Sequence, residues 1–188
     1  ILKINFDNIE KEKFINIIKE LQNFDLLLEF LKVCPLPDIG LENLFRKIRK
    51  KILMIEINFH EYIEIKNFII SLSAQCILNE YIYSRTREEI NKISEIESKI
   101  KHSLKDVEEN LITVLSLYKD LSSYDWINKL NNNLLNEFLK NYLIEVKTER
   151  DLKKTIKSIK EINNIVSVHV KQQYEENPYP RWKNPTIT

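Results

Sequence analysis

Apolar residues recur at intervals of three and four along most of the chain, the period of an α-helix with one buried face. The pattern begins after Asp7, at a short apolar helix that Asp25 opens, and after Asp38, which can cap the helix that follows it. Thr86 and Asp106 are each followed three residues later by a glutamate, which is the spacing of a capping box. Two more helices are predicted near the C-terminus, one starting at Thr148 or Asp151 and one over about residues 163–176.

The segment from about residue 61 to residue 83 has a different pattern. Between Phe68 and Tyr83 it is apolar nearly all round (FIISLSAQCILNEYIY). A helix of this kind is normally enclosed by neighbouring helices, so we predict that it forms the centre of the fold.

Glycine and proline occur in two places only. The chain has one glycine, Gly40, and neither residue occurs between Gly40 and Pro178. This spacing excludes an all-β fold, which needs many tight turns. The sequence therefore predicts an all-α fold: an irregular bundle of about seven to nine helices over residues 1–176, then an extended proline-rich segment over residues 177–188.

Charge and composition exclude several classes of partner. With 29 basic and 28 acidic residues the net charge is +1, so no long-range field favours nucleic acid or an anionic membrane. No apolar run is long enough for a membrane span. The longest basic run has helical spacing and is predicted to form a solvated face; it contains Arg46, Lys47, Arg49, Lys50 and Lys51.

The two cysteines, Cys34 and Cys76, are far apart and form no CxxC pair. Their number and spacing fit a reducing compartment, so we expect a cytoplasmic location. The chain begins Ile1-Leu2-Lys3 without an initiator methionine, and we interpret it as a segment of a longer protein.

Polar residues inside the central helix are the first candidate site. Gln75, Asn79 and Tyr83 are spaced four apart, with Cys76 and Glu80 beside them. We predict a buried hydrogen-bonded network that fixes the helix register. The functional alternative is a polar wall of a ligand or partner site. A cysteine nucleophile at position 76 would need a base, and no histidine lies near it in sequence.

A second set, Glu56, His60 and Glu64, is also spaced four apart. Such a face can bind a metal but is more typical of an exposed charge ladder, so no metal site is predicted. The chain has neither a GxSxG motif nor a glycine-rich loop. No catalytic residue and no nucleotide-type cofactor is therefore assigned to it.

The stretch from Gln173 to Trp182 (QYEENPYPRW) is the most informative feature of the sequence. Pro178 disfavours helical geometry in the residue before it, so the last helix should end at Asn177. Tyr179, Arg181 and Trp182 follow on a stiff extended segment. Such side chains are suited to docking onto another domain, and the alternative is that they pack back on their own bundle.

This decapeptide resembles a segment of bacterial class I S-adenosylmethionine-dependent methyltransferases that often carry tetratricopeptide repeats upstream. In that family the segment lies just before the Rossmann-like catalytic domain. Residues 38–49 (DIGLENLFRKIR) and 68–89 (FIISLSAQCILNEYIYSRTREE) are similar to two further helices of the family. The resemblance covers roughly residues 25–182.

The resemblance implies methyl transfer from S-adenosylmethionine by a longer parent protein, to a protein or small-molecule acceptor. The glycine-rich cofactor loop that should follow residue 182 is missing, so this chain alone should neither catalyse nor bind the cofactor. The segment expected to dock on the parent's own catalytic domain contains Tyr174, Glu175, Tyr179, Arg181 and Trp182. By analogy, the residues that could close over the cofactor are Tyr174, Asn177, Arg181 and Trp182.

Two other functions stay open. The chain could be a non-enzymatic helical interaction module whose C-terminal aromatic residues bind a partner. It could also hold a self-contained metal or thiol site at His60 or Cys76.

Overall fold

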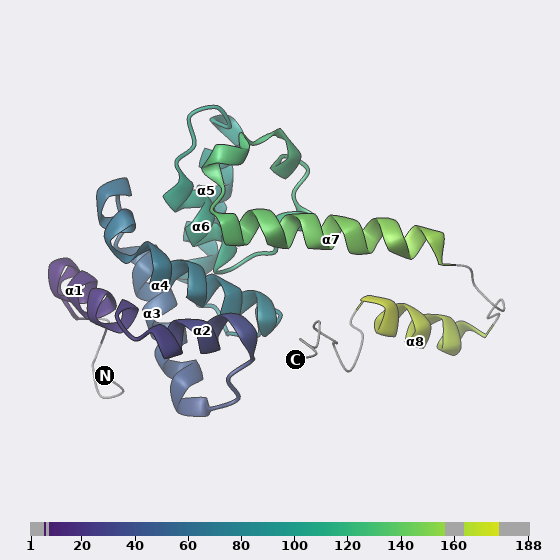
Figure 1. The fold of residues 1–188 in the computed structure, drawn as a ribbon, viewed down its shortest axis with the longest axis horizontal. Coiled ribbons are helices and arrows are strands. Elements are labelled where there is room, and N and C mark those ends of the chain that lie inside the picture. The colour runs from purple at the N-terminus through teal and green to yellow at the C-terminus, as the bar shows by residue number, and fades with distance from the viewer. Residues whose placement is uncertain (1–5, 7, 157–163, 177–188) are drawn as a thin grey trace. The chain divides into compact units, whose positions relative to one another are not determined.

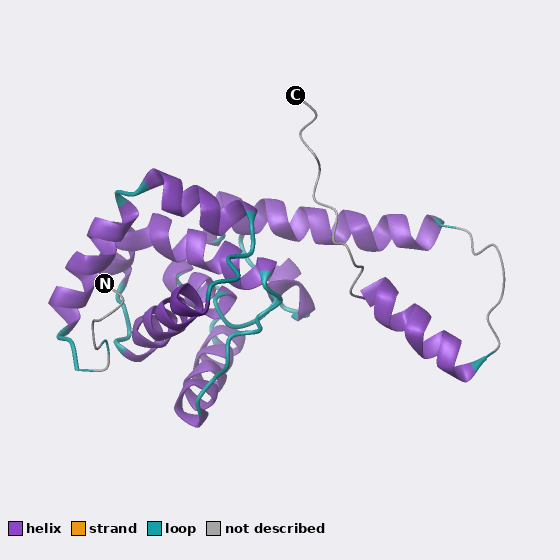
Figure 2. Cartoon of the chain, turned by 90° about the horizontal axis from the view of Figure 1, so that it is seen from below, coloured by secondary structure: helices purple, strands orange, loops and turns teal. Residues whose placement is uncertain are grey.

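The structure, a computed structural model, describes residues 6, 8–156 and 164–176. Helices and short connections account for all of this part, and no strand occurs within it (Figures 1 and 2). The all-α fold predicted from the sequence is confirmed. In chain order the elements are α1 (Lys11–Gln22), α2 (Asp25–Val33), α3 (Ile39–Met54), α4 (Phe59–Leu78), α5 (Arg87–His102), α6 (Glu109–Ser116), three 3-10 turns (Leu121–Ser123, Ile127–Lys129, Asn132–Leu134), α7 (Glu137–Thr155) and α8 (Ile165–Glu176).

The chain divides into two compact units, residues 1–147 and residues 148–188. The first unit contains α1 to α6, the 3-10 turns and most of α7, and it holds the hydrophobic core. In the second unit every side chain that the structure describes is exposed. The predicted segment 177–188 lies outside the described residues, so the predicted division at residue 176 stays a prediction.

Helix α4 is the centre of the first unit, as its apolar composition predicts. It packs against α1, α2 and α6. The four successive residues from Ser71 to Ala74, which point to different sides of α4, are all buried. A helix that is apolar all round is stable only where neighbours cover each side, and three helices do so here.

Three helix starts follow from side-chain capping. The Asp38 carboxylate accepts a hydrogen bond from the Leu41 backbone N–H at 2.8 Å, as predicted. Thr86 forms the predicted capping box with Glu89. Helix α4 begins with a second capping box, Asn58 with Glu61, that the sequence reading missed.

Two predicted starts are wrong. Asp106 lies in a turn, where its N–H donates to the Ser103 carbonyl, and α6 begins three residues later after Glu108. Helix α7 is continuous from Glu137 to Thr155, so Thr148 and Asp151 lie inside it. A residue with capping chemistry caps a helix only where its own backbone is non-helical, typically extended, and the helix follows directly.

The true start of α7 is fixed by Asn136. Its Oδ1 accepts from the Leu139 N–H at 2.9 Å, and its Nδ2 lies 3.3 Å from the Thr113 hydroxyl of α6. A long-range contact between two helices therefore decides where α7 begins.

Helix α4 ends at Leu78, five residues before the predicted end at Tyr83. Glu80 and Tyr81 have φ angles of 56° and 59°, in the left-handed region that side chains other than glycine rarely adopt. The turn they form brings Tyr83 back to a buried position against α3.

Candidate functional site

Arg49 is fully buried on the inner face of α3. The sequence reading placed it on a solvated face with the rest of the basic run, and for Arg49 that prediction is wrong. Lys47, two residues earlier, is exposed. Arg49 lies four residues after Phe45 and three before Ile52, which are both buried, so helical periodicity places it on the same face. This spacing could have predicted the burial of Arg49, although its neighbours in the run are basic.

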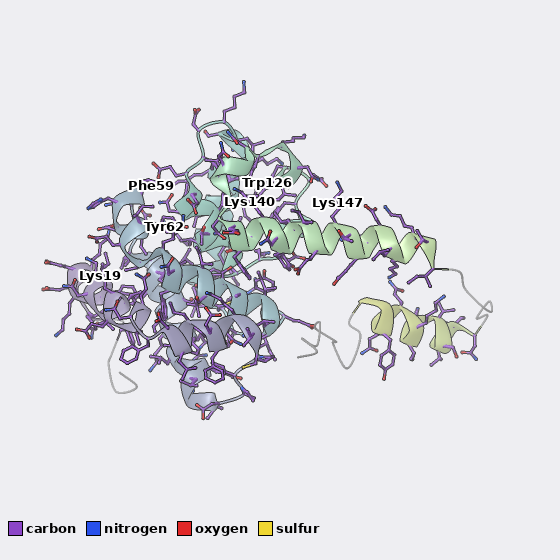
Figure 3. All side chains as sticks on the ribbon, viewed as in Figure 1. Lys19, Phe59, Tyr62, Trp126, Lys140 and Lys147 are labelled. Carbon is purple, nitrogen blue, oxygen red and sulfur yellow. The ribbon has the colours of Figure 1, made fainter. Side chains whose placement is uncertain are left out.

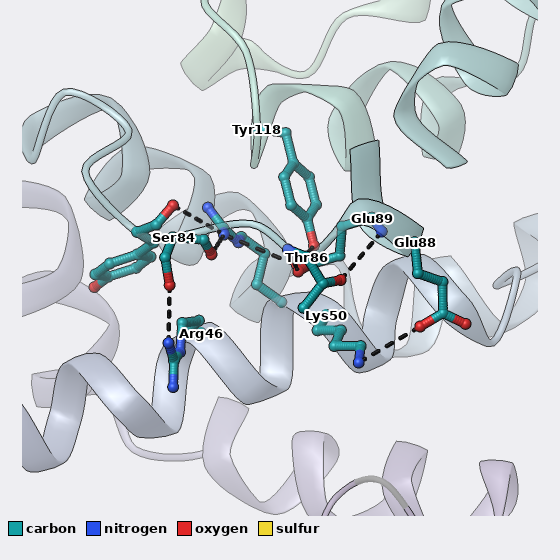
Figure 4. Close-up of polar contacts among 9 residues, drawn as sticks. Arg46, Lys50, Ser84, Thr86, Glu88, Glu89 and Tyr118 are labelled. Atoms are coloured by element: carbon teal, nitrogen blue, oxygen red, sulfur yellow. Dashed lines mark hydrogen bonds and ion pairs between the residues drawn. The ribbon is translucent and has the colours of Figure 1, made fainter. Parts of the chain in front are cut away.

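The guanidinium of Arg49 on α3 contacts the segment after α4 and the first turn of α5. Figure 4 shows Ser84, Glu89 and Tyr118 of this region. Its Nη2 donates to the backbone carbonyls of Tyr83 and Ser84, at 3.3 and 3.0 Å. The same nitrogen lies 3.9 Å from Oε1 of Glu89 on α5, and that carboxylate is equally buried. The Tyr118 hydroxyl donates to Glu89 Oε1 at 2.8 Å. We call Arg49, Tyr83, Glu89 and Tyr118 the Arg49 centre.

Two aromatic rings complete the Arg49 centre. The guanidinium carbon lies 4.2 Å from the centroid of the Tyr118 ring and 5.4 Å from that of Tyr83. Arg49 Nε and Nη1 are buried without a hydrogen-bond partner, and the ring faces compensate part of this cost through cation–π attraction. Burial raises the pKa of both tyrosines above the ordinary value of 10, so both phenols stay protonated at neutral pH.

Glu89 has a double role. Its Oε2 accepts from the Thr86 backbone N–H at 2.7 Å as part of the capping box of α5, while its Oε1 faces Arg49 and Tyr118. Both oxygens of the Glu89 carboxylate therefore have partners, which leaves no free atom for catalysis. We therefore interpret the Arg49 centre as structural.

The four residues of the predicted polar network have different surroundings. Tyr83 is buried in the Arg49 centre, and Gln75 is buried with its Oε1 unpartnered. Asn79 is half-buried beside Tyr83, and hydrogen bonding from Asn79 partly offsets the rise in the pKa of the Tyr83 phenol. Glu80 is exposed. A single network joining all four stays a prediction.

Cys76 is fully buried, and burial raises the pKa of its thiol to about 12 although Arg49 acts in the opposite direction. The thiol is therefore protonated at neutral pH and supplies no thiolate nucleophile.

The geometry does not support a metal site at His60. Glu56 lies before α4 with a φ of 46°, so it shares no helix face with His60 and Glu64. Glu56 pairs with Lys92, and Glu64 pairs with Lys19 at 3.0 Å. Across the described part of the chain, no group of histidine, cysteine, aspartate and glutamate residues is placed to hold a metal.

A second polar cluster, which the sequence did not predict, surrounds Tyr62 near the start of α4. Tyr62 is labelled in Figure 3. The Tyr62 hydroxyl donates to Glu109 Oε1 at 3.0 Å and lies 3.1 Å from the Thr113 hydroxyl. Lys66 forms an ion pair with Glu109 at 2.8 Å. These contacts tie α4 to α6, and Thr113 continues the chain of contacts to Asn136 at the start of α7.

The surface of the first unit has a hollow of about 190 Å³ between the end of α3, the turn before α4, α5 and the start of α6. Half of its lining residues are apolar and half are polar or charged, and Asn110 is among them. A more open depression of about 340 Å³ adjoins it at Lys99 and Leu111 and extends to His102. Neither feature was predicted. The hollow is assembled from segments far apart in the sequence, whereas the depression is lined by residues between Ser98 and Leu111.

The predicted docking residues lie at the end of the described chain. Tyr174 is exposed on α8. Glu175 belongs to the same helix, and its side chain is outside the described part. Asn177, Tyr179, Arg181 and Trp182 lie outside the described residues.

No family model matches the chain, and no curated protein or solved structure matches it either. None of the described helices is long and apolar enough to cross a membrane.

Proposed function

We propose that this chain is a helical accessory region of an S-adenosylmethionine-dependent methyltransferase and docks onto the catalytic domain of the same protein. The resemblance of Gln173 to Trp182 to the pre-domain segment of that family supports the catalytic partner. The observation that carries the docking is an exposed apolar stripe on α8, the helix that leads into this segment. Val166, Val170 and Tyr174 are spaced four apart on it and are 70%, 44% and 59% exposed.

Burial of such a stripe is a substantial driving force. Each apolar side chain of this size contributes roughly 1.5–3 kcal/mol when it is transferred from water into a protein interface. Because every described side chain of the second unit is exposed, this unit has no described core to stabilise its helix. A helix of 12 residues is marginal by itself, so contact with another surface would stabilise it.

In this proposal the two units have separate tasks. The first unit, with its own core and the Arg49 centre, is a stable support that helps to position the methyl acceptor. The second unit joins it to the catalytic domain through Tyr174, Glu175, Tyr179, Arg181 and Trp182. The catalytic domain supplies cofactor binding and methyl transfer, and the chain itself supplies neither.

A non-enzymatic interaction module is the second candidate, because the same stripe on α8 could bind an unrelated protein. The two candidates differ in the coding sequence after Thr188. A predicted strand followed by a glycine-rich loop supports the accessory region, whereas a stop codon supports the interaction module.

Trp182→Ala in the longer protein tests the docking directly. We expect weaker S-adenosylmethionine binding by calorimetry, or slower turnover, with little change in the melting temperature of the helical bundle. Trp126→Ala is the matched control, because Trp126 is buried in the first unit and stacks on Tyr124 with 4.8 Å between ring centroids. Its truncation should destabilise the bundle by about 3–5 kcal/mol. Unchanged cofactor binding and turnover in Trp182→Ala would refute the docking proposal.

A further inference from the structure

Helix α2 carries an apolar stripe on its outer face. Leu26, Phe30 and Val33 follow one another at spacings of four and three, so they share one side of the helix, and they are 71%, 45% and 61% exposed. On the opposite side Leu28 and Leu31 are buried, where α2 packs against α4. The helix is therefore already anchored in the core of the first unit, and its outer stripe is free to contact another molecule. Exposed apolar patches on a folded unit are typical of protein–protein contacts.

Opposite charges lie along one edge of this stripe. Glu29 and Lys32 form an ion pair at 2.8 Å, and both lie on the same side of Phe30. Glu29 is exposed and Lys32 is half-buried. The stripe thus has an apolar centre and one edge with an anion followed by a cation.

This arrangement is complementary to itself when two α2 helices are antiparallel. A twofold axis across the helix reverses its direction and brings the same edge of both copies together. Glu29 of each copy then faces Lys32 of the other, so that the four charges alternate, and the two Phe30 rings meet near the axis. In a parallel pair the opposite edges meet and these charges do not face one another. Charge pairs beside an apolar seam set the orientation of paired helices in this way.

We propose that the stripe on α2 binds a second copy of this chain, as an antiparallel pair of α2 helices about a twofold axis. The nine residues of α2 extend over only about 14 Å, so the contact is smaller than the roughly 800 Å² per partner of a stable complex. We therefore expect a weak dimer, with a Kd on the order of 0.1 mM. This pairing uses neither α8 nor the catalytic domain, so it stands apart from the proposed docking.

Sedimentation equilibrium of the 188-residue chain, from about 10 µM to about 1 mM, tests the pairing. The average mass should rise with concentration from 22.6 kDa toward twice this value. Leu26→Ser should weaken the dimer at least 10-fold. The matched control is Val166→Ser on α8, because Val166 is 70% exposed and should leave the dimer unchanged. Circular dichroism checks that each variant keeps its helical content.

Two charge reversals test the antiparallel arrangement. Glu29→Lys and Lys32→Glu each place like charges opposite one another across the twofold axis, so each variant alone should dimerise about 3- to 10-fold more weakly. Mixed in equal amounts, the two variants again bring opposite charges together, and the mixed dimer should recover the original affinity. The double variant Glu29→Lys/Lys32→Glu should also recover it, which separates this effect from the ion pair within one helix.

Three outcomes would overturn the proposal. A chain that stays monomeric at about 1 mM leaves the stripe on α2 to another occupant, such as the catalytic domain. A dimer that Val166→Ser weakens and Leu26→Ser does not is formed through α8. A mixture of the two charge variants that does not recover affinity excludes the antiparallel pair. If Leu26→Ser does not fold, the charge variants still decide, because they alter only polar side chains at the edge of the stripe.

Discussion

The ring of Tyr118 lies against the buried guanidinium of Arg49, with 4.2 Å between the ring centroid and the guanidinium carbon. The hydroxyl of the same tyrosine donates to Glu89, the carboxylate that balances the charge of Arg49. One side chain thus contacts both members of the ion pair. Through it α3, α5 and the segment after α6 meet at one buried point, and we expect the stability of the first unit to depend strongly on this point.

Replacement of Arg49 should strongly destabilise the protein. Arg49→Met leaves Glu89 as a buried carboxylate without its cation, and loss of one partner of a buried ion pair costs about 3–5 kcal/mol. Chemical denaturation of the variant measures the change in the free energy of unfolding. The control is Lys47→Met, on the exposed side of the same helix, which should change this free energy by less than about 0.5 kcal/mol.

A double variant separates charge from packing. Arg49→Met combined with Glu89→Gln no longer buries a lone charge, so it should be less destabilised than the sum of the two single variants. If the two effects simply add, the carboxylate and the guanidinium do not interact.

Two residues with the same capping chemistry should behave differently. Thr86→Ala removes the Oγ1 that accepts from the Glu89 N–H and should destabilise the protein by about 1 kcal/mol. Asp106→Ala should change stability by less than about 0.5 kcal/mol, because Asp106 lies in a turn before α6 and does not cap it. Thermal unfolding monitored by circular dichroism compares the two variants. Equal losses would contradict the assigned start of α6.

The turn after α4 should be stabilised by glycine. Glu80 is exposed and has a φ of 56°, a conformation that glycine adopts without steric cost. Glu80→Gly should therefore raise the free energy of unfolding by about 0.5–1 kcal/mol, whereas Glu80→Ala keeps the strained conformation and should bring no gain. Urea titration of the three proteins tests this, and a loss of stability in Glu80→Gly would show that the turn is not strained.

The two cysteines should differ in reactivity. Cys34 is partly exposed and should react with a thiol reagent in the folded protein, while Cys76 is fully buried and should react only after unfolding. Absorbance should therefore report one reactive thiol in buffer and two in denaturant. Cys34→Ser should leave none in the folded state.

The raised pKa of Cys76 predicts how the stability of the protein changes with pH. Burial raises it from the ordinary value of 9.0 to about 12, so the folded state holds the proton more tightly than the unfolded state. The contribution of this thiol to stability is complete below about pH 9 and is lost as the pH rises toward 12. Cys76→Ala should remove this component from the pH profile of unfolding. If the free energy of unfolding depends on pH in the same way above pH 9 in the original protein and in Cys76→Ala, the prediction is contradicted.

Local capping chemistry was readable from the sequence at two helix starts that neighbouring residues decide, although the equally local capping box of Asn58 and Glu61 was missed. Asp38 and Thr86 each bond a backbone N–H three residues ahead, and this contact needs no other part of the fold. The start of α7 was missed because Asn136 is held by Thr113 of another helix. The end of α4 was missed because two residues other than glycine adopt positive φ angles there.

The candidate sites were harder to predict. The metal set at Glu56, His60 and Glu64 required one continuous helix, which the turn between α3 and α4 interrupts. Asn110 was not among the predicted residues, because its burial and its hydrogen bond to the Ile57 carbonyl depend on packing between distant segments, as does its unpartnered oxygen. The docking residues from Asn177 onward lie outside the described chain, and their role rests on the resemblance.

The periodic placement of apolar residues by itself determined that this protein is helical and that the segment from Phe68 onward is its centre. These properties are local, because a helix closes its hydrogen bonds within four residues and the apolar face follows from its period. Only the tertiary structure decided that Arg49 is buried against Glu89 and Tyr118 and that Asn110 lines a hollow. Whether a polar side chain meets water or a partner depends on residues far away in sequence, and packing brings those residues together.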